Sequence, residues 1–345
     1  MRLLIPSNRL KWLPKDTRLA HEYCFFLHDE IARMLIEFEG AGAHKVKFKF
    51  SSSRERKRFD ALAKTTDPVS VLKALGRHSE ARRVVLNTIT MAMVSDCAHH
   101  IYEALRCFEK GKVIPGFNLL RKPLLDNLMY FTWMVADEDG FHLAFTSGDP
   151  AKITQKVLGN RRSELMQAAI EETGLSAVVR IEDLHSIIFD VSNPDGLYGL
   201  FQHAVHLVTV DRIEIKTSPE NFNFIFNQPA DQDIYRTLYA SLPTVLLYLA
   251  FLVMTLYQRI HPIENGSRSA FMFRTINGYR LLLGKEASLA VASAIGKVLS
   301  PLLQCANCKT PLKVTESNAA KLLLADCFQC TKCRGKQLFP FSWMF

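Results

Sequence analysis

The feature that most constrains this chain is a pair of cysteine motifs near its C-terminal end, in the stretch CANCKTPLKVTESNAAKLLLADCFQCTKC. This stretch runs from Cys305 to Cys333 and holds five of the eight cysteines, whereas a tetrahedral metal site needs only four. Two Cys-x-x-Cys pairs about twenty residues apart present four thiolates to one ion, as in structural zinc ribbons. The spacing therefore predicts a zinc-ribbon-like domain over residues 304–345, with one structural Zn²⁺ per chain.

The residues after Cys333 decide which cysteines form the second pair. Cys327 leaves a gap of 18 residues after the first pair and fits the common spacing better than Cys330, which leaves a gap of 21. However, a knuckle needs a turn just after its second cysteine, and the Arg-Gly sequence after Cys333 supplies one. Residues 324–328 are expected to form a strand before this knuckle. We therefore expect the metal ligands to be Cys305, Cys308, Cys330 and Cys333, with Cys327 as the spare.

Two other chemistries compete for this cluster. The run Cys327-x-x-Cys330-x-x-Cys333 copies part of a ferredoxin motif, but the Cys-Pro that usually accompanies it is missing. A redox-active dithiol is the other alternative. Zinc needs fewer assumptions, and a zinc ion with four protein ligands leaves no open position for catalysis. The ribbon is therefore expected to bind a partner, a nucleic acid or a protein.

The rest of the chain predicts a mainly α fold, a multi-helix bundle with a small β hairpin in addition to the ribbon. Capping residues, glycines and prolines set the expected boundaries. The expected helices run from Pro68 to Gly76, from Ser79 to Gly111, from the Pro115-Gly116 break to about Asp137, over Ala151–Thr173, over Ser176–Asp190 and over Glu286–Leu303. Two alternating runs, His206–Ile215 and Asn221–Phe226, are expected to form the hairpin. The expected domains are a basic N-terminal region with one helix (1–66), a helical bundle (67–303) and the ribbon (304–345).

One segment, Thr237–Gln258, carries no charge over 22 residues, which is long enough to span a membrane. Pro243 near its start and the absence of a second such segment favour a buried central helix instead. The membrane span stays as the alternative. Because no basic-then-apolar signal segment opens the chain, we expect a cytoplasmic protein, and reduced cysteines are consistent with that compartment.

The charge balance favours acidic partners. The net charge is +9 and the pI is about 9.1, which suits nucleic acid, RNA or DNA. The excess is concentrated in Met1–Arg18, in Lys45–Arg58 and in the cysteine-rich tail. A solvated surface without a partner is the plainer interpretation of such runs.

Two groups of residues in the bundle are candidates for catalysis. Arg121 shares a helical face with Phe117 and Leu124, so its guanidinium is expected to point into an apolar surface and to need a partner such as Asp126 or a ligand phosphate. Pro123 is expected to kink this helix. The second group is His203 and His206, three residues apart, which share a face if helical. The adjacent pair His99-His100 points in different directions and is a weaker candidate.

The segment LLRKPLLDNLMY around Arg121, together with the later stretch from Tyr198 to His206, resembles uncharacterised bacterial helical proteins related to the HEPN superfamily. The resemblance covers roughly residues 79–260. It implies a helical bundle and, in many members, ribonuclease activity in defence or toxin–antitoxin systems. The usual signature is an arginine followed four to six residues later by a histidine. Only Arg180 and His185 fit it here, with Ile181 where a polar residue is common.

These patterns leave three classes of function. In the first, a nucleic-acid-associated protein cleaves RNA without metal, with His206 transferring protons and Arg121 stabilising the phosphorane, or with Arg180 and His185 in those roles. The second is a non-catalytic helical scaffold whose ribbon binds a protein. The third is a membrane-anchored sensor. The sequence does not decide whether the protein is an enzyme, and it leaves the oligomeric state open.

Overall fold

The computed structural model describes residues 4–193, 195–208, 217, 219–220, 232–301 and 303–344, except for the side chains of His203 and Trp343. Within these residues the chain is mainly helical, as predicted, with one small antiparallel sheet beside the cysteines. The hairpin expected over 206–226 falls largely outside the described residues.

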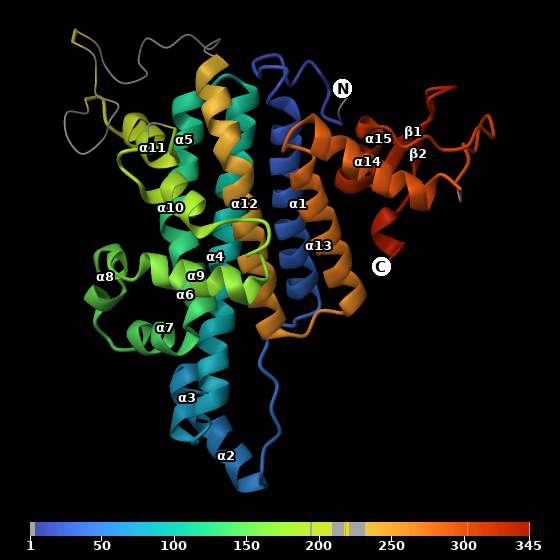
Figure 1. Cartoon of the computed structure of the whole chain (residues 1–345). Coiled ribbons are helices and arrows are strands. Elements are labelled where there is room, and N and C mark those ends of the chain that lie inside the picture. The colour runs from blue at the N-terminus through green and yellow to red at the C-terminus, as the bar shows by residue number, and fades with distance from the viewer. Residues whose placement is uncertain are drawn as a thin grey trace.

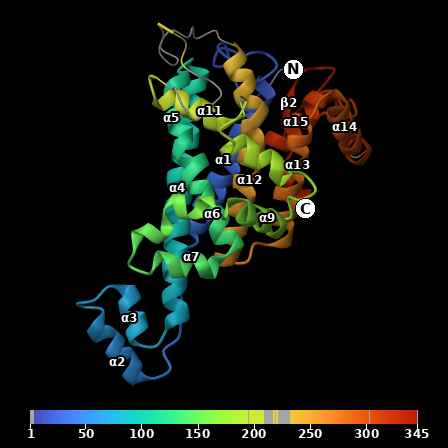
Figure 2. The ribbon, with the colours of Figure 1, turned by 60° about the vertical axis from the view of Figure 1, so that its left-hand side comes forward.

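The helix α12 (Gln232–Ile260) lies in the centre of the bundle (Figures 1 and 2). Every residue from Ser241 to Met254 is buried. By length and composition this helix could cross a membrane, but 89% of its most apolar window is buried inside the protein, as in the core helix of a large bundle. The prediction of a buried central helix is therefore confirmed.

Other helices, some long and some short, pack around α12 and share one apolar core with it. They are α1 (Arg18–Gly40), α4 (His78–Glu109), α5 (Val113–Arg121), α6 (Leu128–Ala136), α9 (Arg162–Thr173), α10 (Ile181–Phe189) and α11 (Leu197–Val205). Because α1 packs along both α12 and α4, the helix of the expected N-terminal region belongs to the bundle itself.

The helix that begins at α5 continues through η1 (Lys122–Asn127), one turn of π-helix, into α6. Pro123 has no N–H to donate to the preceding turn, and the backbone accommodates it by widening: the Leu128 N–H bonds to the Pro123 carbonyl, five residues back. The expected kink at Pro123 is thus a π-bulge that leaves the helix continuous.

Several expected helix ends differ from the structure. The long helix α4 begins at His78, so Ser79 is not its cap. The segment 151–173 is broken by Thr154 and Asn160 into three pieces, which are η2 (Pro150–Ile153), α8 (Gln155–Gly159) and α9. Gly174 does end α9, in the left-handed conformation with φ of 75°. A short helix, α7 (Glu138–Phe145), also comes directly after Asp137.

A basic arm extends from one end of the bundle (Figure 1, bottom). We use this name for residues 45–64, which comprise an extended segment over 45–50 and the helix α2 (Ser53–Leu62). The arm leads into α3 (Pro68–Ala74), which is capped by the Asp67 side chain as predicted and packs on α4. The ion pair of Arg77 with Glu55, at 2.8 Å, ties α2 to the start of α4.

The C-terminal region packs beside α1, at the upper right of Figure 1 and away from the basic arm. Its elements are α13 (Asn265–Arg280), α14 (Lys285–Leu299), α15 (Glu316–Ala325), β1 (Cys327–Gln329), β2 (Lys336–Leu338) and η3 (Phe341–Met344). The helix α15 was not expected from the sequence. Its buried leucines belong to the same core as α12, so the ribbon is fused to the bundle.

Candidate metal centre

The four cysteines selected from the sequence are the ones that the structure brings together. Their Sγ atoms all lie within 4.8 Å of one another. The closest pairs are Cys305 with Cys333, at 3.5 Å, and Cys308 with Cys330, at 3.6 Å. A tetrahedral zinc with Zn–S bonds of about 2.3 Å requires sulfurs about 3.8 Å apart. The donor set and its spacing therefore fit one tetrahedral, thiolate-binding metal ion.

The first pair forms a tight turn that directs both sulfurs to the same point. The Lys309 N–H donates to the Cys305 carbonyl at 2.9 Å, and the Cys305 N–H donates to the Thr310 carbonyl at 2.8 Å. Lys309 adopts a left-handed conformation, with φ of 56°. This is unusual for a residue other than glycine and indicates a backbone held by its surroundings.

The second pair repeats the same turn. The Arg334 N–H donates to the Cys330 carbonyl at 3.1 Å, the Cys330 N–H donates to the Gly335 carbonyl at 2.9 Å, and Arg334 has φ of 61°. A Cβ on Gly335 would lie 2.8 Å from the Asn307 side chain. The expected turn after Cys333 is therefore present, with Arg334 in the left-handed position and the glycine giving room to the first knuckle.

Two of the four thiols, Cys305 and Cys308, are biased towards the thiolate form that a metal needs. Hydrogen bonding with the side chain and the backbone of Thr310 lowers the pKa of Cys308 to about 6. Backbone amides of Cys308 and Asn307 lower the pKa of Cys305 as well. By contrast, although the Gly335 amide favours its thiolate, Cys333 next to the Cys305 sulfur has its pKa raised to about 11. Crowded thiolates repel one another, and a bound cation removes this repulsion.

Cys327 does not belong to the cluster. It begins β1, opposite Leu338, and is only 8% exposed. Burial raises the pKa of its thiol. The strand expected over 324–328 is wrong at its start, because α15 extends to Ala325 and Asp326 ends it in the left-handed conformation, with φ of 45°.

A buried asparagine that sequence reasoning missed connects the two knuckles. Asn318 is 3% exposed and donates its amide to the carbonyls of Lys313 and Gln329, both at 3.0 Å. Its Oδ1 accepts the Gln329 N–H at 2.9 Å. Because Asn318 lies in the first turn of α15, this helix fixes the distance between the two cysteine pairs.

A second missed residue, Arg274 on α13, joins the ribbon to the bundle. Its side chain is 8% exposed and approaches Glu30 on α1 at 3.4 Å and Asp326 at 3.7 Å. Its Nε donates to the Leu323 carbonyl at 2.7 Å, and its guanidinium lies 5.0 Å from the centre of the Phe26 ring. One buried arginine thus contacts three parts of the fold.

The structure places Arg121 differently from the expectation. The buried stripe of this helix passes through Phe117, Leu120 and Leu124, and Arg121 lies at its edge and is exposed. A long side chain at such a position reaches solvent easily. The prediction of a guanidinium in an apolar surface is therefore wrong.

The carboxylate near this helix is Asp96 on α4, and Asp126 is not the partner that was expected. Lys122 Nζ lies 2.9 Å from Asp96 Oδ1, and Asn127 donates to Oδ2 at 3.0 Å. Of the two adjacent histidines, His100 bonds the Asp96 carbonyl at 2.8 Å. The Lys122 and Asn127 contacts fasten η1 to α4, whereas the His100 bond lies within α4.

The histidine candidates do not form a metal site among the described side chains. His206 comes after α11 and is exposed, and the side chain of His203 lies outside the described residues. Within the described part of the chain, the cysteine cluster is the group with metal-binding geometry. The proposed pairing of Arg121 with His206 stays a prediction.

The Arg180 and His185 pair is occupied by local contacts. Arg180 is the N-cap of α10, and its exposed side chain bonds both carboxylate oxygens of Asp183, at 2.7 and 2.8 Å. His185 is half-buried, with its ring 5.7 Å from that of Phe189. The Arg180 charge is thus already paired on its own helix, in an ordinary surface arrangement.

A buried polar network that no sequence pattern indicated lies between α1, α4 and α12. His21 is fully buried, with its Nδ1 2.5 Å from the Tyr239 hydroxyl and its Nε2 3.3 Å from Glu109. The Glu109 carboxylate also forms ion pairs with Arg9, at 2.7 Å, and with Arg106, at 2.5 Å. Burial lowers the pKa of His21 despite the neighbouring carboxylate, so a neutral imidazole that accepts from Tyr239 and donates to Glu109 fits these contacts.

Comparison of the chain with protein-family models, curated protein sequences and solved structures gave no match.

Proposed function

We propose that this protein binds the phosphate backbone of a nucleic acid through its basic arm, and that a structural zinc ion holds the four-cysteine ribbon. The observation that carries the proposal is the arm itself. Eight of the twenty residues from 45 to 64 are lysine or arginine, and two are acidic. Phosphate neutralisation by such clusters dominates the affinity of most nucleic-acid-binding proteins.

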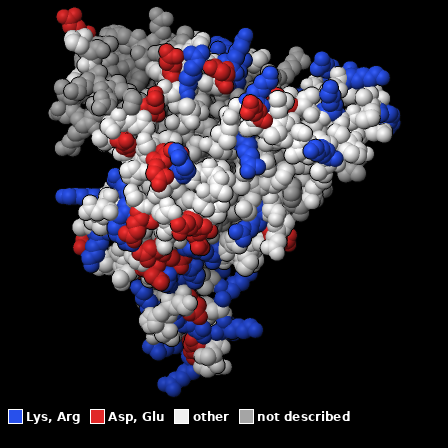
Figure 3. All heavy atoms as spheres, in the orientation of Figure 1, with Lys and Arg blue, Asp and Glu red and all other residues white. Residues whose placement is uncertain are grey.

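The arm exposes its charge because little else covers it. In α2 no residue is buried, and all four of its basic side chains are exposed. In the extended segment the side chains alternate, with Lys45, Lys47 and Lys49 exposed and the apolar residues between them half-buried. Basic side chains therefore lie along both the extended segment and α2, and Figure 3 shows several of them at the lower tip of the molecule, with acidic groups among them.

The apolar side of the arm is packed, which holds the basic side in place. The rings of Phe48, Phe50 and Phe59 contact one another, with centroids 5.2 to 6.0 Å apart. Arg77 lies over the Phe48 ring at 4.9 Å and pairs with Glu55. An arm fixed in this way loses less conformational entropy on binding than a free tail would.

A second basic surface surrounds the cysteine cluster. Its exposed side chains are Lys309, Lys313, Lys332, Arg334 and Lys336. The metal, closed by four thiolates, would act on folding and not on catalysis. The ribbon then positions these cations on the same molecule as the arm (Figure 3, upper right).

Binding is a better proposal than cleavage for the residues described. Arg121 is exposed at the edge of its helix, and Arg180 is paired with Asp183. Neither arrangement desolvates an arginine, as stabilisation of a transition state requires. The resemblance to HEPN ribonucleases gives cleavage as a second activity to assay, alongside binding.

The test measures affinity for labelled RNA and DNA as a function of salt. Wild type should bind at low salt, with log K falling linearly against log salt. The variant Arg54→Gln/Arg58→Gln removes two exposed cations from one face of α2 and should make that slope shallower by roughly 1.5. Its matched control is Lys152→Gln/Lys156→Gln, two exposed cations near α8 with the same total charge change.

Equal slopes for the two variants would assign binding to net charge alone. If wild type does not bind at low salt, the nucleic-acid proposal is wrong. Zinc content, measured on the same preparations, should be one ion per chain.

A further inference from the structure

A cavity of about 760 Å³ opens at the base of the basic arm. It is formed by the end of α1, the chain that leads into the arm, the first half of α4 and the loop between α12 and α13. Lys45 and Lys47 of the arm line it, together with Arg83 of α4. The cavity and the proposed path of the phosphate backbone therefore share two lysines.

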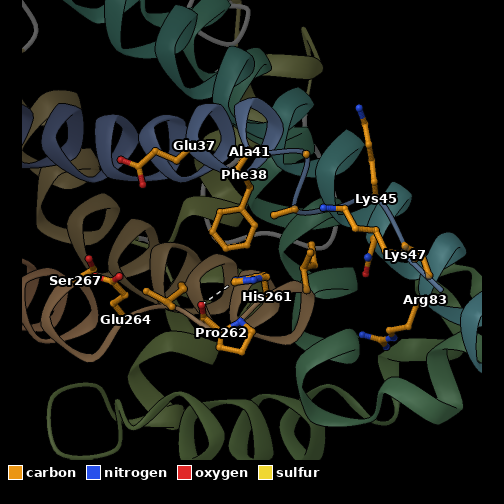
Figure 4. A pocket seen from close by; sticks show the side chains of 16 residues that line it. Glu37, Phe38, Ala41, Lys45, Lys47, Arg83, His261, Pro262, Glu264 and Ser267 are labelled. Carbon is orange, nitrogen blue, oxygen red and sulfur yellow. Dashed lines mark hydrogen bonds between the residues drawn. The ribbon is translucent and has the colours of Figure 1, made fainter. Parts of the chain in front are cut away.

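One side of the cavity is apolar and carries flat groups. Figure 4 shows the Phe38 ring on the same side as His261 and Pro262. Phe38 is held by the ring of Tyr257, at 4.5 Å between centroids. Nucleobases stack on aromatic side chains regardless of their identity, since every base has a π-face.

The cavity wall holds a buried polar atom that lacks a hydrogen-bond partner among the described residues, Asn87 Oδ1. Asn87 is 4% exposed. Its amide nitrogen donates to the His44 carbonyl at 3.0 Å, which fixes the orientation of the amide. An unpaired buried acceptor is costly, and because less than 1 Å² of this oxygen is accessible, a ligand N–H reaches it only when the cavity wall shifts towards the ligand.

The charges around the cavity define a direction. Lys45, Lys47 and Arg83 lie on one side, and Glu37 and Glu264 lie on the other, beyond the flat groups (Figure 4). Arg83 is paired with Glu138, so the two lysines supply the available positive charge. A ligand with an anionic end and a flat, hydrogen-bonding end matches this order.

We propose that the cavity accepts one unstacked nucleotide of a single-stranded nucleic acid. Its base would lie against Phe38 and donate an N–H to Asn87 Oδ1, and its phosphate would lie at Lys45 and Lys47. Each of the common bases carries an N–H on its Watson–Crick edge. This inference rests on the proposed function and narrows it, because a base inside a duplex cannot reach such a cavity without leaving the stack.

The test separates base from backbone. Fluorescence anisotropy is measured with a short oligothymidylate and with an abasic oligomer of the same length and charge. Wild type should bind the base-containing strand roughly tenfold more tightly, as expected for one stacked base. Asn87→Leu and Ser267→Trp, the latter placed to block the cavity, should each remove this preference while leaving the abasic strand bound. Ser269→Trp, on the same helix but outside the cavity lining, should keep it.

The outcomes distinguish the two proposals. Equal binding of both strands by wild type overturns the cavity inference and leaves the arm proposal standing. Binding of neither strand at low salt overturns both. If Ser267→Trp weakens the binding of the base-containing and abasic strands by the same factor, as Ser269→Trp does, the preference for the base-containing strand does not come from the cavity, and the inference fails. Thermal unfolding of every variant identifies any that are misfolded. If either Asn87→Leu or Ser267→Trp is misfolded, the other of the two tests the cavity inference.

Discussion

Replacement of Arg274 by methionine should destabilise the junction between the bundle and the ribbon. The arginine is 8% exposed and contacts Glu30, Asp326 and the Leu323 carbonyl. Removing it leaves Glu30, itself 7% exposed, with Arg33 as its remaining cation. It also leaves a buried carbonyl without its donor. Breaking a buried pair in this way costs about 3–5 kcal/mol.

The magnitude can be divided by a double-mutant cycle. The charge-assisted bond to the Leu323 carbonyl contributes about 1.5–3 kcal/mol of this. Glu30→Gln removes the opposing charge, so Arg274→Met should cost about 1–2 kcal/mol less in that background than in wild type. Arg280→Met on the same helix is exposed and should change stability by no more than about 0.5 kcal/mol.

The assay is urea unfolding followed by circular dichroism, with release of the bound metal recorded in the same titration. Because Arg274 contacts α15 next to the second cysteine pair, its loss should release the bound metal before the bundle unfolds. A stability change of Arg274→Met below about 0.5 kcal/mol would refute the claim that this arginine joins the two parts.

Further predictions concern the metal ligands, the buried histidine and Arg121. Replacement of Cys305, Cys308, Cys330 or Cys333 by serine should abolish metal binding, whereas Cys327→Ser should retain it, as measured by metal analysis of the purified protein. Loss of the metal in Cys327→Ser, with retention in Cys333→Ser, would reverse the ligand assignment. The pKa of the buried His21 is lowered from its ordinary value of 6.5, so on acidification the imidazole is protonated in the unfolded state before it is protonated in the folded state. The free energy of unfolding should therefore be highest above about pH 6.5 and fall as the pH drops below that value. Thermal unfolding between pH 7 and 5 should show this fall, and the pH dependence should be weaker in His21→Gln. Arg121→Met should leave stability within about 0.5 kcal/mol of wild type because the side chain is exposed; an RNA-cleavage assay on the same variant tests the catalytic role inferred from the resemblance.

Much of the fold could be predicted because its signals are local. The N-cap Asp67 and the stop at Gly174 act within one turn of helix. The central helix was recognisable from its uncharged length, and its burial is confirmed. The helix α15 was missed because a ribbon was expected to be made of strands, although Thr315 is a good N-cap residue, and its hydroxyl accepts the Asn318 N–H.

The residues of the candidate sites also fall into those that a local sequence signal indicates and those that only the folded chain brings together. The cysteine cluster could be predicted because metal geometry restricts ligand spacing along the chain. Arg121 was misplaced because its distance of four residues from Phe117 puts it at the edge of the stripe, and periodicity alone does not tell edge from centre. Arg274 and the His21 network could not be found, since their partners lie 244 and 218 residues away and only the packed fold brings them together.

Nucleic-acid binding by the arm can be examined without any substitution, by photocrosslinking wild-type protein to thio-substituted single-stranded RNA and DNA and identifying the crosslinked peptides by mass spectrometry. We expect crosslinks to residues 45–64, where the exposed cations of the arm lie, and to the segment that contains Phe38. Crosslinks confined to the ribbon, residues 304–344, or no crosslinks at low salt would contradict binding by the arm.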